Sequence, residues 1–155
     1  MAEEAKAADE VQLVVFSLGR EEFGVEVTQV REIMRMEEIT RMPKSPHFVE
    51  GIINLRGQII AVIDLAKRMN VELGERGAET RIIVVEAGDV KVGMIVDSVS
   101  EVLRVSADAV EPSPSMASDA SAAFLQGVVK HDNRLIILLD LTKVLSLEEM
   151  AGLGF

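Results

Sequence analysis

The chain contains the segment Phe48-Val-Glu-Gly-Ile-Ile-Asn-Leu-Arg-Gly-Gln-Ile-Ile-Ala-Val-Ile-Asp-Leu65 and, 76 residues later, its near copy Phe124-Leu-Gln-Gly-Val-Val-Lys-His-Asp-Asn-Arg-Leu-Ile-Ile-Leu-Leu-Asp-Leu141. Phe, Gly, Ile, Asp and Leu recur at matching places, and most other differences exchange one aliphatic residue for another. Each copy has two apolar runs separated by a short polar stretch, which is the pattern of a β-hairpin. The sequence therefore predicts a duplicated β unit.

A second match lies upstream, where residues 24–36 resemble residues 93–105 at a spacing of 69. The seven residues by which the two spacings differ fall in the Pro- and Ser-rich segment 110–123, which predicts a long loop. The copies thus run from about residue 13 to 69 and from about 82 to 145. We predict a first subdomain at 11–75 and a second at 76–147.

Each copy is predicted to have about five short strands joined by tight turns. Short strands with glycine at the corners favour small closed barrels, because closure removes exposed sheet edges. Units of this size bury little surface alone, so the two should share an apolar interface. The predicted fold is all-β, with two tandem five-stranded barrels, short helices and a groove between the barrels. The sequence leaves open whether a strand crosses from one barrel to the other.

Local signals refine this architecture. Gly57 and Asn133 stand at the two hairpin tips, and both residue types tolerate positive φ, which predicts a left-handed turn at each tip. Asp64 and Asp140 follow the hairpins and are predicted to cap short helices. The helical spacing of Val27, Val30, Ile33 and Met34 predicts about one helical turn before a strand at 38–42.

Composition excludes several classes of function. The net charge is -10, and no more than two Lys or Arg residues are adjacent, which argues against nucleic acid as a partner. The chain has no cysteine, so disulfides and thiolate chemistry are absent. The longest apolar runs have five residues, far short of the roughly 20 needed to span a bilayer. We expect a cytoplasmic protein with a disordered acidic tail at 1–10 and a C-terminal tail at 148–155.

Groups suited to catalysis are few. His47 and His131 occupy non-equivalent points of the two copies and have no carboxylate or ligand partner at a recognisable spacing. Asp64 and Asp140 are explained by capping. We therefore predict no catalytic residue, no metal and no cofactor. The alternative is a small β-barrel enzyme or ligand-binding protein that uses Asp64, Asp140 or His131.

The differences between the copies indicate where function lies. Arg56 at the first hairpin tip is replaced by Asp132 at the second, so the duplication kept the scaffold and reversed an exposed charge. Arg56 is either a solvated turn residue or a guanidinium that faces the groove and pairs with a partner. The recurrence of Glu32 and Arg35 as Glu101 and Arg104 indicates a structural ion pair at least as readily as a binding role.

The first copy, which contains Arg56, also has a cluster of methionines. Met34, Met36 and Met42 cluster in the first copy, whereas the second has Leu103 and Val105 at two of these positions. Methionine is flexible and fills gaps in cores, but it also forms adaptable binding faces. Both interpretations remain open at this point.

Residues 48–65 resemble the signature hairpin of the CheW-like family of chemotaxis coupling proteins. The Phe-x-Leu-Gly-x-Glu-x-Phe-Gly-Val pattern that begins at Phe16, and the stretch Val30-Arg-Glu-Ile33, are similar to the first strands of that family. The resemblance extends from about Leu13 to Met150. It implies two SH3-like barrels in a noncatalytic adapter that joins chemoreceptor cytoplasmic tips to the regulatory domain of the histidine kinase CheA.

The resemblance also implies roles for particular residues. Receptor binding is implied at Val30, Glu32 and Arg56, and kinase binding, on weaker grounds, is implied at Met34, Met36 and Glu37. The adapter would be recruited to membrane receptor arrays without inserting into the membrane, and it could form mixed rings with the kinase. The alternative within the family is a paralogue that regulates another histidine-kinase system.

Overall fold

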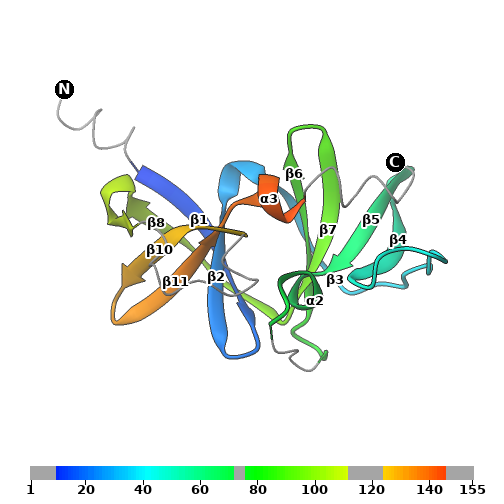
Figure 1. The fold of residues 1–155 in the computed structure, drawn as a ribbon, viewed down its shortest axis with the longest axis horizontal. Helices are drawn as coiled ribbons and strands as arrows, with labels where there is room; N and C mark the ends of the chain where they lie inside the picture. Colours follow the sequence, from blue (N-terminus) through cyan, green and yellow to red (C-terminus); the bar gives the residue numbers. More distant parts are fainter. Residues whose placement is uncertain (1–9, 72–75, 112–123, 146–155) are drawn as a thin grey trace.

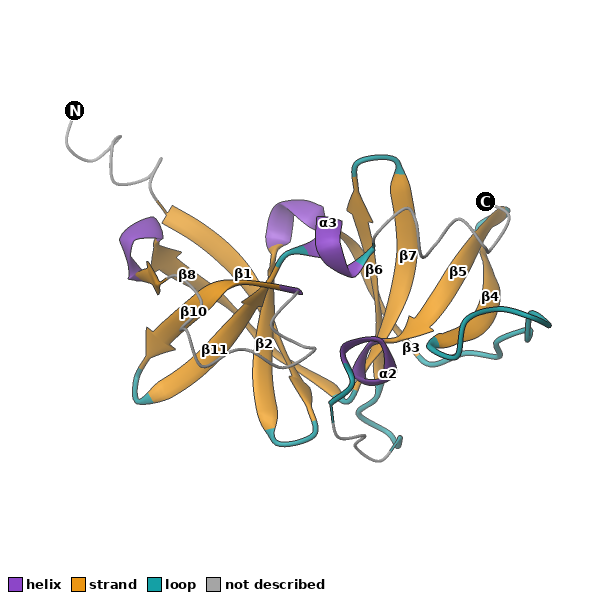
Figure 2. Cartoon of the chain, viewed as in Figure 1, coloured by secondary structure: helices purple, strands orange, loops and turns teal. Residues whose placement is uncertain are grey.

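The computed structural model describes residues 10–71, 76–111 and 124–145. Apart from Glu10, Val110 and Glu111, the predicted tails and the predicted long loop lie outside these residues. The described residues form two β-sheets, sheet A and sheet B, which lie side by side with two short helices between them (Figure 1). Figure 2 shows that both bodies consist mainly of strands, joined by loops and short helices.

The two sheets have the same internal order. Sheet B has the order β3-β6-β7-β5-β4, and sheet A has the order β8-β1-β2-β11-β10-β9. The strands of sheet B are β3 (Val30–Arg35), β4 (Val49–Leu55), β5 (Gln58–Asp64), β6 (Arg81–Ala87) and β7 (Val90–Val96). The strands of sheet A are β1 (Glu10–Leu18), β2 (Glu21–Glu26), β8 (Ser98–Ser106), β9 (Val110–Glu111), β10 (Leu125–His131) and β11 (Arg134–Leu139). The helical segments are η1 (Val27–Gln29), α2 (Leu65–Met69), η2 (Ala107–Ala109) and α3 (Leu141–Val144).

Each sheet closes on itself through the chain that follows one edge strand. In sheet B, Thr40 follows β3 and forms a bridge with Ile52 of β4, with N–O distances of 2.9 and 2.8 Å. In sheet A, β9 follows β8 and pairs with β10 at the opposite edge. We therefore call the two bodies barrel A and barrel B, and the predicted pair of small barrels is observed.

The barrels do not follow the predicted boundaries at 11–75 and 76–147. Barrel A combines β1 and β2 with β8–β11, whereas barrel B contains β3–β7. Each repeat thus donates its first hairpin to the other barrel, and the parallel pairs β2–β11 and β5–β7 join strands from different repeats. Both repeats have nearly the same apolar pattern, so either hairpin satisfies either barrel and periodicity alone does not select the partner.

Three apolar clusters stabilise this arrangement. Leu13 and Val15 of β1 point into barrel A, whereas Val14 and Phe16 point toward barrel B, because successive side chains of a strand face opposite sides. β6 does the same in barrel B, with Ile82 and Val84 inside and Ile83 and Val85 at the junction. The largest cluster, the shared core, therefore lies between the barrels, as the predicted apolar interface requires.

The helical turn predicted from Val27 to Met34 is wrong beyond its first three residues. Only Val27–Gln29 is helical, as a 3-10 turn, and Val30–Arg35 forms strand β3. Pairing with β6 determines this conformation, since tertiary context overrides a short periodicity signal. The strand predicted at 38–42 is reduced to the single bridge at Thr40.

The predicted caps and turns are confirmed. Asp64 accepts a hydrogen bond from the amide of Lys67 at 3.2 Å, and Asp140 accepts one from the amide of Thr142 at 3.0 Å. At the hairpin tips, Gly57 has φ 86° and Asn133 has φ 65°. The residues before them, Arg56 and Asp132, also have positive φ, so both tips have the two left-handed positions of a type I′ turn.

Candidate binding surface

Arg56 and Glu32 form an ion pair at one end of barrel B. The distance from Arg56 Nη1 to Glu32 Oε1 is 2.7 Å. The Arg56 side chain is 76% exposed and the Glu32 side chain is 24% exposed. An exposed ion pair contributes only about 0–1 kcal/mol to folding, because solvent screens it and the side chains lose entropy. The pair is therefore available for exchange with a charged partner.

The hairpin tip fixes the position of Arg56. Its backbone has φ 52°, which is uncommon for a residue with a side chain. Asn54 stabilises the turn, because its Oδ1 accepts a hydrogen bond from the amide of Gly57 at 2.8 Å. Glu32 stands on β3, whose pairing with β6 has a bulge between Val30 and Glu32. A bulge re-aims the side chain beside it, which here brings Glu32 to the hairpin tip.

Barrel A has a different arrangement at the equivalent place. Glu101 is the counterpart of Glu32, but its partner is Arg134 at the start of β11, at 2.9 Å. Arg134 also donates two hydrogen bonds to Glu22, both of 2.9 Å. These hydrogen bonds to Glu22 and Glu101 raise the pKa of Arg134 above its ordinary value. In barrel A, Arg134 thus combines a bidentate pair with Glu22 and a contact with Glu101, whereas in barrel B Arg56 and Glu32 make a single contact.

The pairs suggested by the recurrence of Glu32 with Arg35 and of Glu101 with Arg104 do not form. Each glutamate pairs instead with an arginine of the β4–β5 or β10–β11 hairpin. Residues three apart on a strand face opposite sides of the sheet, so Arg35 points away from Glu32. The recurrence therefore reflects the repeated strand pattern.

Val30 lies at the junction of the two barrels. It is partly buried and packs against the shared core, as do Val27 and Val99.

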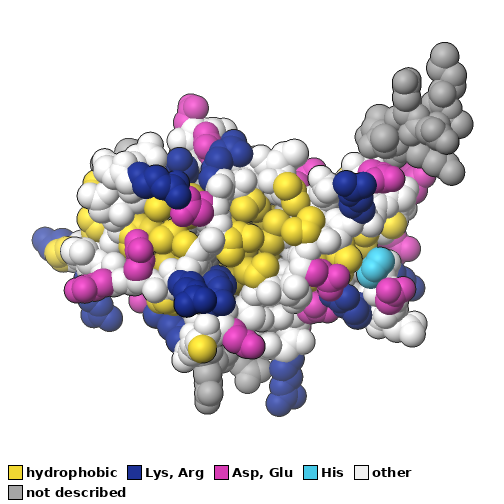
Figure 3. All heavy atoms as spheres, turned by 180° about the vertical axis from the view of Figure 1, so that it is seen from behind, with side chains coloured by type: hydrophobic (Ala, Val, Ile, Leu, Met, Phe, Trp, Pro, Cys, Tyr) yellow, Lys and Arg dark blue, Asp and Glu magenta, His cyan; other side chains and the backbone are white. Residues whose placement is uncertain are grey.

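Figure 3 shows the face opposite to Figure 1, where hydrophobic side chains form a band across the middle and charged side chains surround it. An apolar band with a charged border is the usual composition of a protein-binding surface.

The residues assigned to kinase binding divide into two groups. Met34 and Met36 are partly buried and pack against the interior of barrel B, which supports the core interpretation for both. Glu37 is exposed. Between the methionines and Glu32, the outward-facing Ile33 is 42% exposed, and Ile59 of the same barrel is 50% exposed.

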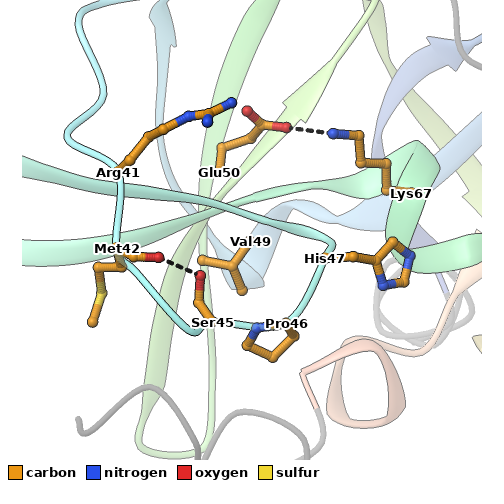
Figure 4. Close-up of a pocket in the computed structure, with 8 residues that line it drawn as sticks. All are labelled: Arg41, Met42, Ser45, Pro46, His47, Val49, Glu50 and Lys67. Atoms are coloured by element: carbon orange, nitrogen blue, oxygen red, sulfur yellow. Dashed lines mark hydrogen bonds and ion pairs between the residues drawn. The ribbon is translucent and has the colours of Figure 1, made fainter.

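A polar network lies beside α2. Glu50 contacts Lys67 at 3.0 Å and Arg76 at 3.1 Å, and Arg76 contacts Asp64 at 2.7 Å. Figure 4 shows Glu50 between Lys67 and Arg41, on the wall of an open pocket of about 210 Å³. Burial works against ionisation of Glu50, but the hydrogen bond from Lys67 and the charge of Arg76 outweigh it and hold the pKa of Glu50 below 4.5. Burial likewise opposes the charge of Arg76, but Asp64 and Glu50 raise its pKa.

This network predicts that Glu50 contributes to the loss of folding stability at acid pH. The folded-state pKa of Glu50 is depressed, so its stabilising effect is complete above about pH 4.5 and is lost as pH falls through the folded-state pKa. We expect Glu50→Gln to lower the melting temperature at pH 7 and to flatten its decline as pH falls below about 4.5. Melting curves at several pH values measure this. A decline as steep as in the unmodified protein would show that other carboxylates account for it.

The other residues considered for catalysis, Asp64 and the two histidines, make contacts within the fold. Asp64 is buried and is held by the α2 cap and Arg76, and the His47 ring stands edge-on to Phe48 at 5.8 Å. His131 is next to Asp132, with Nε2 and Oδ2 3.5 Å apart. Within residues 10–71, 76–111 and 124–145, no three His, Asp or Glu side chains gather in a way that could bind a metal ion. The helices among these residues are all too short to span a membrane.

The sequence interpretation missed two arginines. Arg134 was not selected, although it replaces Gln58 in the second repeat and that charge difference was a usable signal. Arg68, which lies between the barrels, follows no periodic pattern. Its role depends on how the two barrels pack, because the guanidinium lies against Phe48 and Phe124, which precede strands of different barrels.

Comparisons with known proteins agree with this architecture. The CheW-like domain family matches residues 12–149. The chemotaxis protein CheW of Thermotoga maritima is 38% identical over 141 residues, which cover 91% of each chain. The chemotaxis protein CheW of Klebsiella aerogenes is 36% identical over 140 residues, covering 90% of this chain and 84% of its own.

A solved structure is similar throughout. The crystal structure of the scaffolding protein TtCheW from Thermoanaerobacter tengcongensis aligns with a TM-score of 0.83 and 39% identity, covering 90% of this chain and 94% of its own. This likeness confirms the predicted all-β fold of two SH3-like barrels. The relatives are scaffolds of chemotaxis signalling and are not enzymes. The chain therefore belongs to the CheW-like domain family, as a noncatalytic chemotaxis scaffold.

Proposed function

We propose that the protein joins the cytoplasmic tip of a chemoreceptor to the regulatory domain of the histidine kinase CheA. In this proposal it works in the cytoplasm, is recruited to membrane receptor arrays, and acts by holding its two partners in one geometry. Contacts that are weak individually then add through effective concentration. Mixed rings with the kinase are a further part of the proposal.

The receptor site is proposed at Val30, Glu32 and Arg56. The observation that supports it is the single-contact, exposed Arg56–Glu32 pair, in contrast to the bidentate Arg134 network in barrel A. A receptor tip is a helical hairpin, and an amphipathic helix requires an apolar strip with charged groups beside it. Val30, which is partly buried against the shared core, would be the apolar contact, and Arg56 and Glu32 would be the charged groups.

The kinase site is proposed on the outer face of barrel B. Ile33 and Ile59 are exposed there, and they have equivalents on barrel A, since Val102 is 56% and Leu135 is 60% exposed. Met34, Met36 and Glu37 lie on or directly after the same strand as Ile33. Exposed aliphatic side chains at the centre of a contact favour protein binding, and Glu37 would contribute at its polar border.

NMR chemical-shift mapping of the isotope-labelled protein tests the proposed receptor site and the proposed kinase site. Addition of a receptor tip fragment should shift amide signals near Val30, Glu32 and Arg56, and addition of the kinase regulatory domain should shift those near Ile33 and Ile59. Receptor-induced shifts confined to barrel A would contradict the proposed receptor site. Binding of the kinase domain alone would favour a paralogue that serves another histidine-kinase system.

A further inference from the structure

Arg68 of α2 connects the two barrels. Its side chain is buried, with 8% of the residue exposed. The guanidinium lies 4.8 Å from the ring centre of Phe48 and 4.5 Å from that of Phe124. Its Nε donates to the carbonyl of Val144 at 2.8 Å, and its Nη2 donates to the carbonyl of Lys143 at 3.4 Å. A buried guanidinium is tolerated because the aromatic faces and the carbonyl oxygens at the end of α3 replace its hydration.

The two rings are duplicated residues that belong to different barrels. The carbonyl of Phe48 accepts a hydrogen bond from the amide of Asp64 at 2.7 Å, and the carbonyl of Phe124 accepts one from the amide of Asp140 at 2.9 Å. Each phenylalanine is thereby fixed to the capping aspartate that ends the hairpin of its own barrel. Arg68 lies between the two rings, so its contacts join two rigid bodies.

The duplication is asymmetric at this point. The residue 76 positions after Arg68 is Val144, which is fully buried and accepts the hydrogen bond. One arginine thus connects both helices. The rest of the shared core is mainly aliphatic, and apolar burial has no directional preference. The hydrogen bonds and ring contacts of Arg68 are directional. They add to the constraint on the angle from the two places where the chain crosses between the barrels, at Val27–Gln29 and at Asp97.

We propose that Arg68 is a positioning residue that fixes the angle between barrel A and barrel B, and with it the shape of the junction where Val30 and Val99 pack. Its functional part rests on the proposed adapter function, because the receptor site is proposed at this junction and the kinase site on the outer face of barrel B alone. Arg68 itself contacts neither partner. Its loss should therefore weaken receptor binding, which needs the junction, and leave kinase binding intact.

The first test measures the angle directly. The chain has no cysteine, so cysteines introduced at the exposed Asp89 of barrel B and Lys130 of barrel A provide a unique pair of spin-label sites. Arg68→Met retains an apolar side chain of similar length, and we expect it to broaden the distance distribution between the labels. Arg68→Lys retains the cation and a donor, and we expect it to keep most of the original width.

The second test compares the two binding reactions. With Arg68→Met, the affinity for the kinase regulatory domain should change by less than about twofold. The affinity for a receptor tip fragment should fall at least about tenfold, because a junction whose angle varies is no longer preorganised for the fragment. Val129→Ala, inside barrel A, serves as a control that lowers stability without touching the junction.

The outcomes separate the two proposals. An unchanged label distance distribution in Arg68→Met, or receptor binding that falls equally in Val129→Ala, would overturn the role of Arg68. If Arg68→Met does not fold, Phe124→Leu removes one ring and should broaden the same distribution, and unchanged width there would overturn it as well. If the unmodified protein binds neither partner, the adapter function fails, whereas the label distances still decide whether Arg68 fixes the angle.

Discussion

Arg56→Glu is expected to weaken binding of a chemoreceptor tip by about 30-fold or more, while the protein remains folded. The Arg56 side chain is mostly exposed and makes one ion pair, so its replacement costs little stability. The new carboxylate would stand beside Glu32 and convert a charged pair into two like charges. A receptor carboxylate that meets a guanidinium in the unmodified protein would then meet repulsion.

Arg104→Glu is the matched control, because it makes the same change in charge at an exposed residue of barrel A. Its receptor affinity should stay within about twofold of the unmodified value, since it lies outside the proposed site. Calorimetric titration with a receptor tip fragment measures both variants, and melting curves establish that both fold. Equal weakening by the two changes would mean that net charge, and not the site, governs binding.

Gly51→Ala is expected to have the largest effect on stability, of at least about 3 kcal/mol. Gly51 has φ 151°, and a Cβ there would overlap the carbonyl oxygen of Thr40 and lie 2.7 Å from the Thr40 carbonyl carbon. Thr40 forms the bridge that closes barrel B, so the clash falls on the closure itself. Gly127 makes the same close approach to Glu111 in barrel A.

Gly57→Ala separates the cost of the steric clash from the cost of the positive φ. Gly57 has φ 86° but nothing lies within 4 Å of the position its Cβ would take. The substitution should therefore cost only the strain of the left-handed conformation, about 1–2 kcal/mol. Denaturant unfolding of both variants measures the difference. If Gly51→Ala is no less stable than Gly57→Ala, the close approach to Thr40 does not constrain barrel closure.

The duplication predicted the local structure well. Strand order within each hairpin, the caps at Asp64 and Asp140 and the left-handed tips depend on neighbouring residues, so local sequence determines them. Strand β3 was partly misassigned because its conformation depends on pairing with β6, which is remote in sequence. The exchange of hairpins between barrels was beyond prediction, since two similar repeats offer interchangeable partners.

The same distinction applies to the candidate site. Arg56 was selected because it breaks the symmetry of the repeats, and the structure pairs it with the independently selected Glu32. The partner of Glu101 was missed because Arg134 reaches it across sheet A, where β11 pairs in parallel with β2 of the other repeat. Arg68 was missed for a similar reason, since Phe48 and Phe124 meet it only after the barrels pack.

Co-sedimentation of the purified protein with receptor-bearing membranes and with the kinase, each alone and both together, tests the central proposal most directly. We predict that the protein binds each partner alone, and that it brings the kinase into the membrane pellet in amounts that depend on its own concentration. The Arg56→Glu variant should bring much less kinase into the pellet, although it still binds the kinase. A kinase that sediments equally well without the protein, or a protein that binds only one of the two partners, would contradict the proposal.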